Sequence, residues 1–275
     1  MKRLLFPFLL LLPVLAAAAP KAELWDLWVS HRPGSDLQID HGLWDRLLET
    51  YLFTEDPSGV YLFDYAGVDA PARESLNRYL QQMQRVEVSR LNRDEQMAFW
   101  INLYNALTIR VILDHWPVSS IREINLGGGG LLGRGPWDAP LATVEGTGVT
   151  LNDIEHRILR PIWQDPRIHY AVNCASIGCP NLQSKAFTGA NLEELLEAGA
   201  RAYVNHSRGV ERSGNTLYLS SIYDWFSEDF GTNRGEILKY IRGHASGGTA
   251  EALDFFLSGE GRLRYRYDWS INAVR

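Results

Sequence analysis

The reactive side chains of this sequence are concentrated between residues 165 and 180, in the stretch DPRIHYAVNCASIGCP. Both cysteines of the chain, Cys174 and Cys179, lie in this stretch, together with His169 and Asn173. A cysteine thiolate close to an imidazole and a polarising amide is the general arrangement for acyl transfer. The sequence therefore makes Cys174 the candidate nucleophile of a cysteine-dependent hydrolase or acyltransferase acting on an amide or a thioester.

A base for Cys174 has two candidates. His156 is the first, because it lies beside Glu155 on a predicted short helix. A helix next to the cysteine stretch can point a side chain toward Cys174. His169 is the second: the apolar residues from 168 to 172 predict a buried strand, and strand alternation turns His169 away from Cys174. Glu155 would orient the base.

The two cysteines also have interpretations without catalysis. An oxidising compartment favours a Cys174–Cys179 disulfide in a non-catalytic binding or interaction domain, and an inert buried cysteine is common. Their C-x₄-C spacing lacks the second pair that is typical of zinc sites, so no metal and no cofactor is expected.

A long helix must position this chemistry. Asn92, with Glu95 three residues later, resembles a capping box, and Trp116-Pro117 ends the run. The sequence between them, QMAFWINLYNALTIRVILDH, is apolar almost all the way round, which predicts a buried central helix.

Three asparagines are candidates for substrate binding. Asn102 and Asn105 share one face of the predicted central helix, and Asn173 precedes Cys174. Either these amides line a cleft, where Asn102 or Asn173 would orient the base or donate to an oxyanion, or they bond the backbone of neighbouring loops.

The first 18 residues have the layout of a secretory signal peptide: Lys2-Arg3, a leucine-rich run and then alanines. We therefore expect a periplasmic or secreted protein that is not integral to the membrane once the signal is removed. The formal net charge is −6, and losing two basic residues with the signal makes it more acidic. Such a balance argues against nucleic-acid binding and leaves a small molecule or a peptide as the expected ligand.

The remainder, residues 19–275, is expected to form a single α+β domain in which the central helix and flanking helices pack on a mostly antiparallel sheet. The glycine run 127–130 is interpreted as a flexible loop leading into a hairpin, because no phosphate-loop lysine follows it. Further helices are predicted at 21–53, 70–86, 191–205, 234–242 and 249–257, and strands at 216–220 and 262–269, with two short strands around a turn at 141–151.

Three blocks in this order, AFWINLYNALTIRVILDHWPV, LNDIEHRILRP and DPRIHYAVNCASIGCP, resemble the domain of unknown function 547 family over about residues 95–231. The resemblance implies a fold and a site location more than a reaction. The sequence more loosely resembles the papain-like and transglutaminase-like group, whose buried helix carries the cysteine nucleophile. It departs from that group because the predicted central helix has Asn102 where the cysteine would stand.

Overall fold

The computed structural model describes residues 20–127 and 135–274. The predicted signal peptide and all but the first glycine of the run 127–130 lie outside the described residues. No helix in the described part of the chain combines the length and the apolarity that crossing a bilayer requires.

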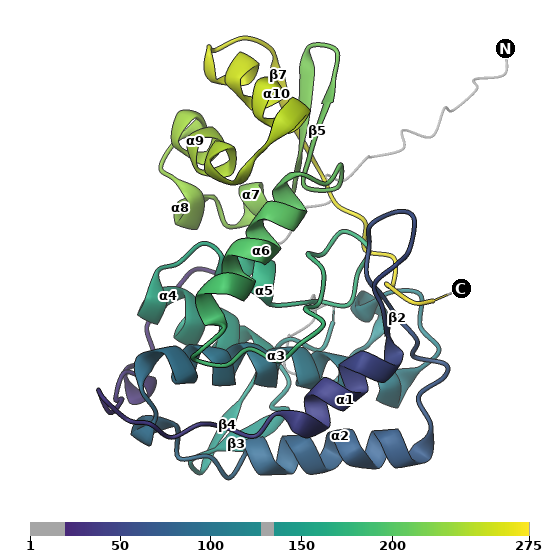
Figure 1. Cartoon of the computed structure of the whole chain (residues 1–275), viewed down its shortest axis with the longest axis vertical. Helices are drawn as coiled ribbons and strands as arrows, with labels where there is room; N and C mark the ends of the chain where they lie inside the picture. Colours follow the sequence, from purple (N-terminus) through teal and green to yellow (C-terminus); the bar gives the residue numbers. More distant parts are fainter. Residues whose placement is uncertain (1–19, 128–134, 275) are drawn as a thin grey trace, which may run out of the picture.

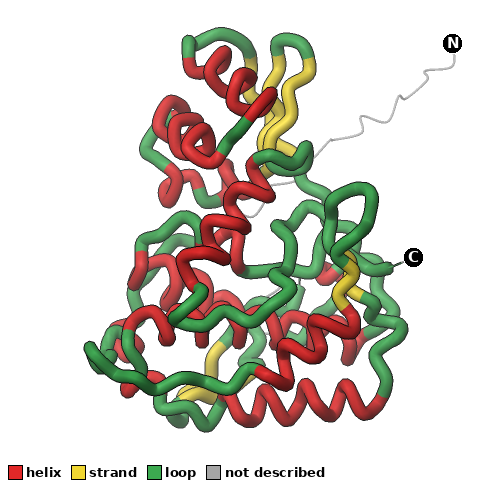
Figure 2. Tube along the Cα trace, in the orientation of Figure 1, coloured by secondary structure: helices red, strands yellow, loops and turns green. Residues whose placement is uncertain are grey.

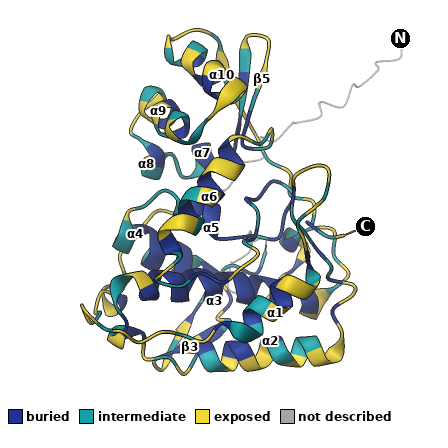
Figure 3. Cartoon of the chain, viewed as in Figure 1, coloured by how far each residue is buried: buried dark blue, intermediate teal, exposed yellow. Residues whose placement is uncertain are grey.

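Helix α3, Arg93–His115, is the centre of the structure, as predicted. The Asn92 side chain caps it by accepting a hydrogen bond from the backbone N–H of Glu95 at 2.9 Å. Eighteen of its residues are buried, and it appears as a dark blue rod surrounded by other elements (Figure 3). Because Trp100 and Leu103 are fully enclosed, truncating either to alanine is expected to cost about 3–5 kcal/mol.

Other helices and the first small sheets cover α3 (Figures 1 and 2). Helix α2 packs on α3, and α1 packs on α2. The elements of this part of the chain are η1 Asp26–Trp28, α1 Gly42–Tyr51, β1 Leu52–Phe53, β2 Leu62–Phe63, α2 Ala70–Met83, η2 Val88–Arg90, η3 Ile121–Glu123, β3 Ala142–Val144 and β4 Thr147–Val149. The π-helix η5 Asp153–Leu159, α4 Arg160–Trp163 and α5 Ile168–Ala171 follow.

The last third of the chain builds a second cluster of buried apolar residues, seen at the top of Figure 1. A three-stranded sheet in the order β5-β6-β7 lies here, with β5 and β6 antiparallel and β6 and β7 parallel. The elements are α6 Leu192–Val204, β5 Val210–Ser213, β6 Thr216–Ser220, α7 Ile222–Trp225, α8 Ser227–Phe230, α9 Arg234–His244, α10 Gly247–Leu257 and β7 Arg262–Arg266.

The α+β class is confirmed, but the strands within residues 20–127 and 135–274 form three small sheets instead of one sheet under α3. Two local predictions are wrong. The region 21–53 is helical mainly over α1, and residues 168–171 form the helical turn α5 instead of a strand. The reason for the second lies just upstream, where the Asp165 carboxylate accepts the backbone N–H of Arg167 at 2.9 Å and starts a turn.

The cysteine stretch lies between the two cores. Val172 and Ala175 belong to the first core, whereas Tyr170 belongs to the second. The Tyr203 hydroxyl of the second core donates to the backbone oxygen of Gly178 at 2.6 Å. A thiol in this stretch is therefore held by both halves of the molecule.

Candidate functional site

Two asparagine side chains fix the backbone around the cysteines. Asn105 on α3 donates to the oxygen of Ala171 at 2.9 Å and accepts the backbone N–H of Asn173 at 2.8 Å. Asn173 in turn donates to the oxygen of Pro180 at 2.7 Å and accepts from the N–H of Ala175 at 2.8 Å. Ala175 has a φ of +58°, a conformation that costs a non-glycine residue energy and persists only where its surroundings hold it.

The sulfur atoms of Cys174 and Cys179 lie 3.2 Å apart, which is hydrogen-bond distance and well beyond the ~2.05 Å of a disulfide bond. Both thiols are free in this structure, in which the alternative Cys174–Cys179 disulfide is not formed. Cys179 Sγ also accepts the backbone N–H of Cys174 at 3.1 Å. Cys174 is partly exposed, whereas Cys179 is 4% exposed.

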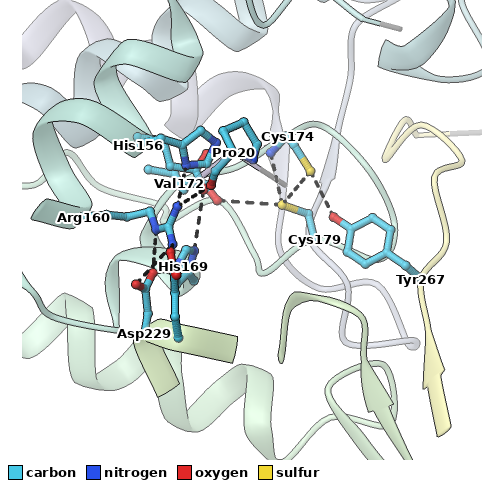
Figure 4. A network of polar contacts seen from close by, with 11 residues as sticks. Pro20, His156, Arg160, His169, Val172, Cys174, Cys179, Asp229 and Tyr267 are labelled. Carbon is cyan, nitrogen blue, oxygen red and sulfur yellow. Dashed lines mark hydrogen bonds and ion pairs between the residues drawn. The ribbon is translucent and has the colours of Figure 1, made fainter. Parts of the chain in front are cut away.

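Two hydroxyl groups complete the surroundings of the first sulfur. Tyr267 Oη lies 3.0 Å and Ser176 Oγ lies 3.3 Å from Cys174 Sγ, and the two oxygens are 3.0 Å from each other. Tyr267 follows strand β7, and Figure 4 shows its hydroxyl pointing at the pair of sulfurs. We call Cys174, Cys179, Ser176 and Tyr267 the sulfur cluster.

The sulfur cluster shifts the two thiols in opposite directions. The hydrogen bond from Cys179 lowers the pKa of Cys174 below its ordinary value despite burial, and the Ser176 and Tyr267 hydroxyls lower it further. Burial raises the pKa of Cys179 well above its ordinary value. Burial and the neighbouring thiols also raise the pKa of Tyr267, so its hydroxyl stays protonated and can donate to a thiolate.

The two candidate bases make their hydrogen bonds elsewhere. His156 Nδ1 lies 3.1 Å from Arg160 Nη1, and His169 Nε2 lies 2.6 Å from an Asp229 carboxylate oxygen. His156 also borders a surface hollow of about 460 Å³, whose described lining does not include Cys174. The predicted hydrogen bond between Cys174 and an imidazole is therefore not part of this structure, in which the thiol meets hydroxyls instead.

His169 lies between two acids. Its Nδ1 is 3.6 Å from the Glu155 carboxylate, and its ring stacks on Phe226 with centroids 4.3 Å apart. Arg160, only 2% exposed, pairs with Asp229 at 2.6 Å and with Glu228 at 2.9 Å. We call His156, Glu155, His169, Arg160 and Asp229 the charge cluster (Figure 4).

The ionisation states in the charge cluster follow from these pairs. Burial opposes ionisation of Glu155, but the positive charges of His156, His169 and Arg160 lower its pKa to about 2. Burial, assisted by Arg160, lowers the pKa of His156 to about 4, so His169 and Arg160 supply the positive charge near neutral pH. Burial alone would lower the pKa of His169, but its hydrogen bonds to Asp229 and Glu155 raise it above the ordinary value.

The local backbone explains how these side chains meet. Thr150 and Asp153 cap each other, with the N–H of Asp153 donating to Thr150 Oγ1 at 2.9 Å and the N–H of Thr150 to the Asp153 carboxylate at 3.0 Å. The helix that follows is a π-helix, a form that often occurs at functional sites. It presents Glu155 and His156 to the charge cluster.

The Asn102 side chain also forms hydrogen bonds with the backbone. It donates to the oxygen of Phe187 at 2.7 Å and accepts the Phe187 N–H at 3.0 Å. Asn102, Asn105 and Asn173 thus hold the loops around α3, which is the second of the two predicted roles. Within the part of the chain that the structure describes, no group of three or more His, Cys, Asp or Glu side chains is placed to hold a metal ion.

Sequence reasoning missed four members of the two clusters. Ser176 lies within the cysteine stretch, and Tyr267 lies on the strand predicted at 262–269, which gave no reason to link it with a cysteine 93 positions away. Arg160 stands in the block LNDIEHRILRP and Asp229 lies near the end of the range 95–231, but neither position indicated a pairing.

Comparison with known proteins agrees with part of the predicted resemblance. Residues 88–204 match the family described as "Protein of unknown function, DUF547". This DUF547 segment contains α3, η5 and both cysteines, and it ends before residue 231, to which the predicted resemblance extended. No curated protein and no solved structure matches the chain, so the likeness to the papain-like and transglutaminase-like group stays a prediction.

Proposed function

We propose that the DUF547 segment carries a thiol–disulfide exchange centre in which Cys174 is the attacking sulfur and Cys179 is the resolving sulfur. The observation that carries the proposal is the asymmetric pair: two free sulfurs lie 3.2 Å apart, one of them partly exposed and the other enclosed. An exposed thiol with a lowered pKa beside a buried thiol is suited to this chemistry, since the thiolate is the attacking species.

The reaction follows from the positions of the groups. The Cys174 thiolate attacks one sulfur of a partner disulfide, which breaks the partner's S–S bond and releases its second sulfur as a thiolate that takes up a proton. Cys179 then loses its proton and attacks Cys174 Sγ, forming the Cys174–Cys179 bond and releasing the partner's first sulfur as a thiol. The partner gains two electrons, and the dithiol of this protein is oxidised. The same steps in reverse oxidise a partner dithiol.

The hydroxyls assist the first step. Tyr267 and Ser176 donate hydrogen bonds to the thiolate of Cys174, which stabilises the reactive ionisation state before the partner arrives. Ala175, held at a positive φ by Asn173, fixes the turn between the two sulfurs. A leader of the kind seen in residues 1–18 would deliver the protein to an oxidising compartment where disulfide partners are abundant.

The test compares two serine variants of the reduced protein with a disulfide-bonded peptide as the partner. Cys179→Ser is expected to trap a mixed disulfide on Cys174, seen by mass spectrometry as the added mass of one half of the peptide. Cys174→Ser is expected to trap nothing, because Cys179 is enclosed and its pKa is raised. Equal trapping by both variants, or trapping by neither, would contradict the proposal.

The same variants address acyl transfer by Cys174, the function predicted from the sequence. It is favoured by the two hydroxyls at 3.0 and 3.3 Å from the sulfur, which can donate to a developing negative charge nearby. An acyltransferase needs only Cys174, so Cys179→Ser would keep turnover of an activated thioester, whereas exchange turnover requires both sulfurs. Finding a permanent Cys174–Cys179 disulfide that resists mild reductants would instead favour a binding domain with a structural bridge.

A further inference from the structure

Four large aromatic side chains continue outward from the sulfur cluster. Tyr267, whose hydroxyl contacts Cys174 Sγ, packs against Trp225 and Trp269 with ring centroids 4.9 and 4.7 Å apart. The two tryptophans lie 5.6 Å from each other with their planes only 27° apart, and Trp137 meets Trp269 edge-on at 5.9 Å. We call Trp137, Trp225, Tyr267 and Trp269 the aromatic wall.

The aromatic wall spans the seam between the two cores. Trp137 and Trp269 pack against the first core, whereas Trp225 and Tyr267 pack against the second. All four are only partly buried, so ring surface remains in contact with solvent beside the partly exposed Cys174. Partly exposed tryptophan and tyrosine are the residues that most often anchor a bound partner.

The apolar character of the aromatic wall indicates which kind of side chain it can bind. The rings are uncharged, and the cation beside them, Arg122, already lies 5.2 Å over the ring of Trp269. An apolar surface of this kind gains most from covering by an apolar or aromatic side chain, since burial of such surface is the favourable term. A polypeptide can place such side chains next to its reacting cysteine.

We propose that the aromatic wall binds an apolar or aromatic residue next to the reacting cysteine of a polypeptide partner. The inference rests on the proposed exchange function, because the partner's sulfur must reach Cys174 and its neighbouring side chains must then lie against Tyr267 and the tryptophans. The substrate class is therefore a polypeptide disulfide flanked by apolar residues, and the wall supplies specificity while the two cysteines supply the reaction.

Two measurements test the proposal separately from the chemistry. The first is the ratio of kcat/KM for two disulfide peptides that differ only in the residue beside the cysteine, phenylalanine or aspartate. We expect the wild type to prefer phenylalanine by about tenfold, and Trp269→Leu or Trp225→Leu to reduce the preference to about twofold, the scale of one aromatic contact. Trp163→Leu is the matched control, since Trp163 is a half-buried tryptophan that packs near Arg93.

The second measurement is binding of the phenylalanine peptide with serine in place of its cysteine, followed by tryptophan fluorescence. Binding that weakens about fivefold in Trp269→Leu, but not in Trp163→Leu, supports the wall even if no exchange occurs, in which case only the exchange function fails. If exchange shows no preference for the phenylalanine peptide and the serine peptide does not bind, the proposed role of the aromatic wall is wrong. The exchange function is then still supported. Circular dichroism of each variant checks that the fold is retained.

Discussion

The charge cluster around His169 and the sulfur cluster around Cys174 are near neighbours in the chain, but they satisfy their polar groups differently. In the charge cluster every ion has a partner of opposite sign, with Arg160 buried against Asp229 and His169 between two carboxylates. In the sulfur cluster the contacts to Cys174 come from a thiol and two hydroxyls, which carry no charge.

This difference indicates that the reactive group of the site is the Cys174 thiol and not a member of the charge cluster. Paired ions in a buried setting hold each other's charge states, so changing one of them is expected to damage the fold first. Neutral donors around a thiol allow it to gain a charge without a fixed counter-ion, and the partly exposed position of Cys174 lets a second molecule reach it. We therefore interpret His156, His169 and the acids paired with them as a clamp that joins distant segments, while the role of either histidine as a catalytic base stays a prediction.

The contacts of the charge cluster support the clamp. Arg160 Nη1 donates to the backbone oxygen of Pro20 at 2.8 Å, and the N–H of Glu23 donates to the oxygen of His156 at 3.0 Å. The cluster thus joins the start of the described chain, the π-helix η5 and helix α8, which carries Asp229.

The largest expected effect is the loss of stability when the ion pairs of the charge cluster are broken. Arg160→Gln is expected to lower the free energy of unfolding by about 3 kcal/mol, because it removes the buried guanidinium from Asp229 and Glu228 and leaves Asp229 with His169 alone. Arg157→Gln is the control: Arg157 is 39% exposed and pairs with Asp153 one helical turn away, so its loss should cost less than ~1 kcal/mol. Urea unfolding measures both, and equal costs for the two variants would contradict the clamp.

The second effect is the response of stability to pH. Glu155 and Asp229 have pKa values of about 2, below their ordinary values of about 4, so the stability they provide is present above about pH 4 and is lost as the pH falls toward 2. His156, with a pKa of about 4, adds a further loss between about pH 6.5 and 4, because the unfolded chain binds the proton more readily. His169 acts in the opposite sense: its raised pKa contributes stability below about pH 6.5 that is lost as the pH rises through its folded value.

Together these groups predict a loss on the order of several kcal/mol between pH 6 and pH 3, measured by urea unfolding at each pH. Glu155→Gln removes one of the titrating acids, so its acid limb should be shallower than that of the wild type. An identical slope in the variant would show that Glu155 keeps an ordinary pKa.

The smallest expected effect tests the hydrogen bond from Tyr267 to Cys174 in the sulfur cluster. Tyr267→Phe removes a donor to the Cys174 thiolate and is expected to raise the pKa of this thiol, which slows its alkylation by iodoacetamide at pH 7. Tyr265→Phe is the control, because this exposed tyrosine lies on β7, two positions before Tyr267.

The same alkylation assay compares the clusters directly. His156→Ala is expected to leave the rate at Cys174 within about twofold, since the imidazole bonds Arg160 and not the sulfur. A collapse of the rate in His156→Ala, with the fold retained, would restore the histidine base that the sequence predicted.

Much of the fold was predictable because its signals are local. The Asn92 cap and the apolar run defined α3, a short helix was expected around Glu155 and His156, and the pattern at 262–269 predicted the strand that contains β7. The strand predicted at 168–172 failed because a short apolar run is compatible with either structure, and the turn at Asp165 decided for a helix.

The sequence by itself determined that Cys174 and Cys179 would be neighbours, because four residues separate them, and that α3 would be buried, because its apolar residues leave no polar face. Only the tertiary structure decided what surrounds them. Tyr267 and Asp229 reach the two clusters from the last third of the chain, where the second core packs against the first. Periodicity and caps report on residues a few positions apart, whereas the partner of a thiol or an imidazole is set by how distant segments pack.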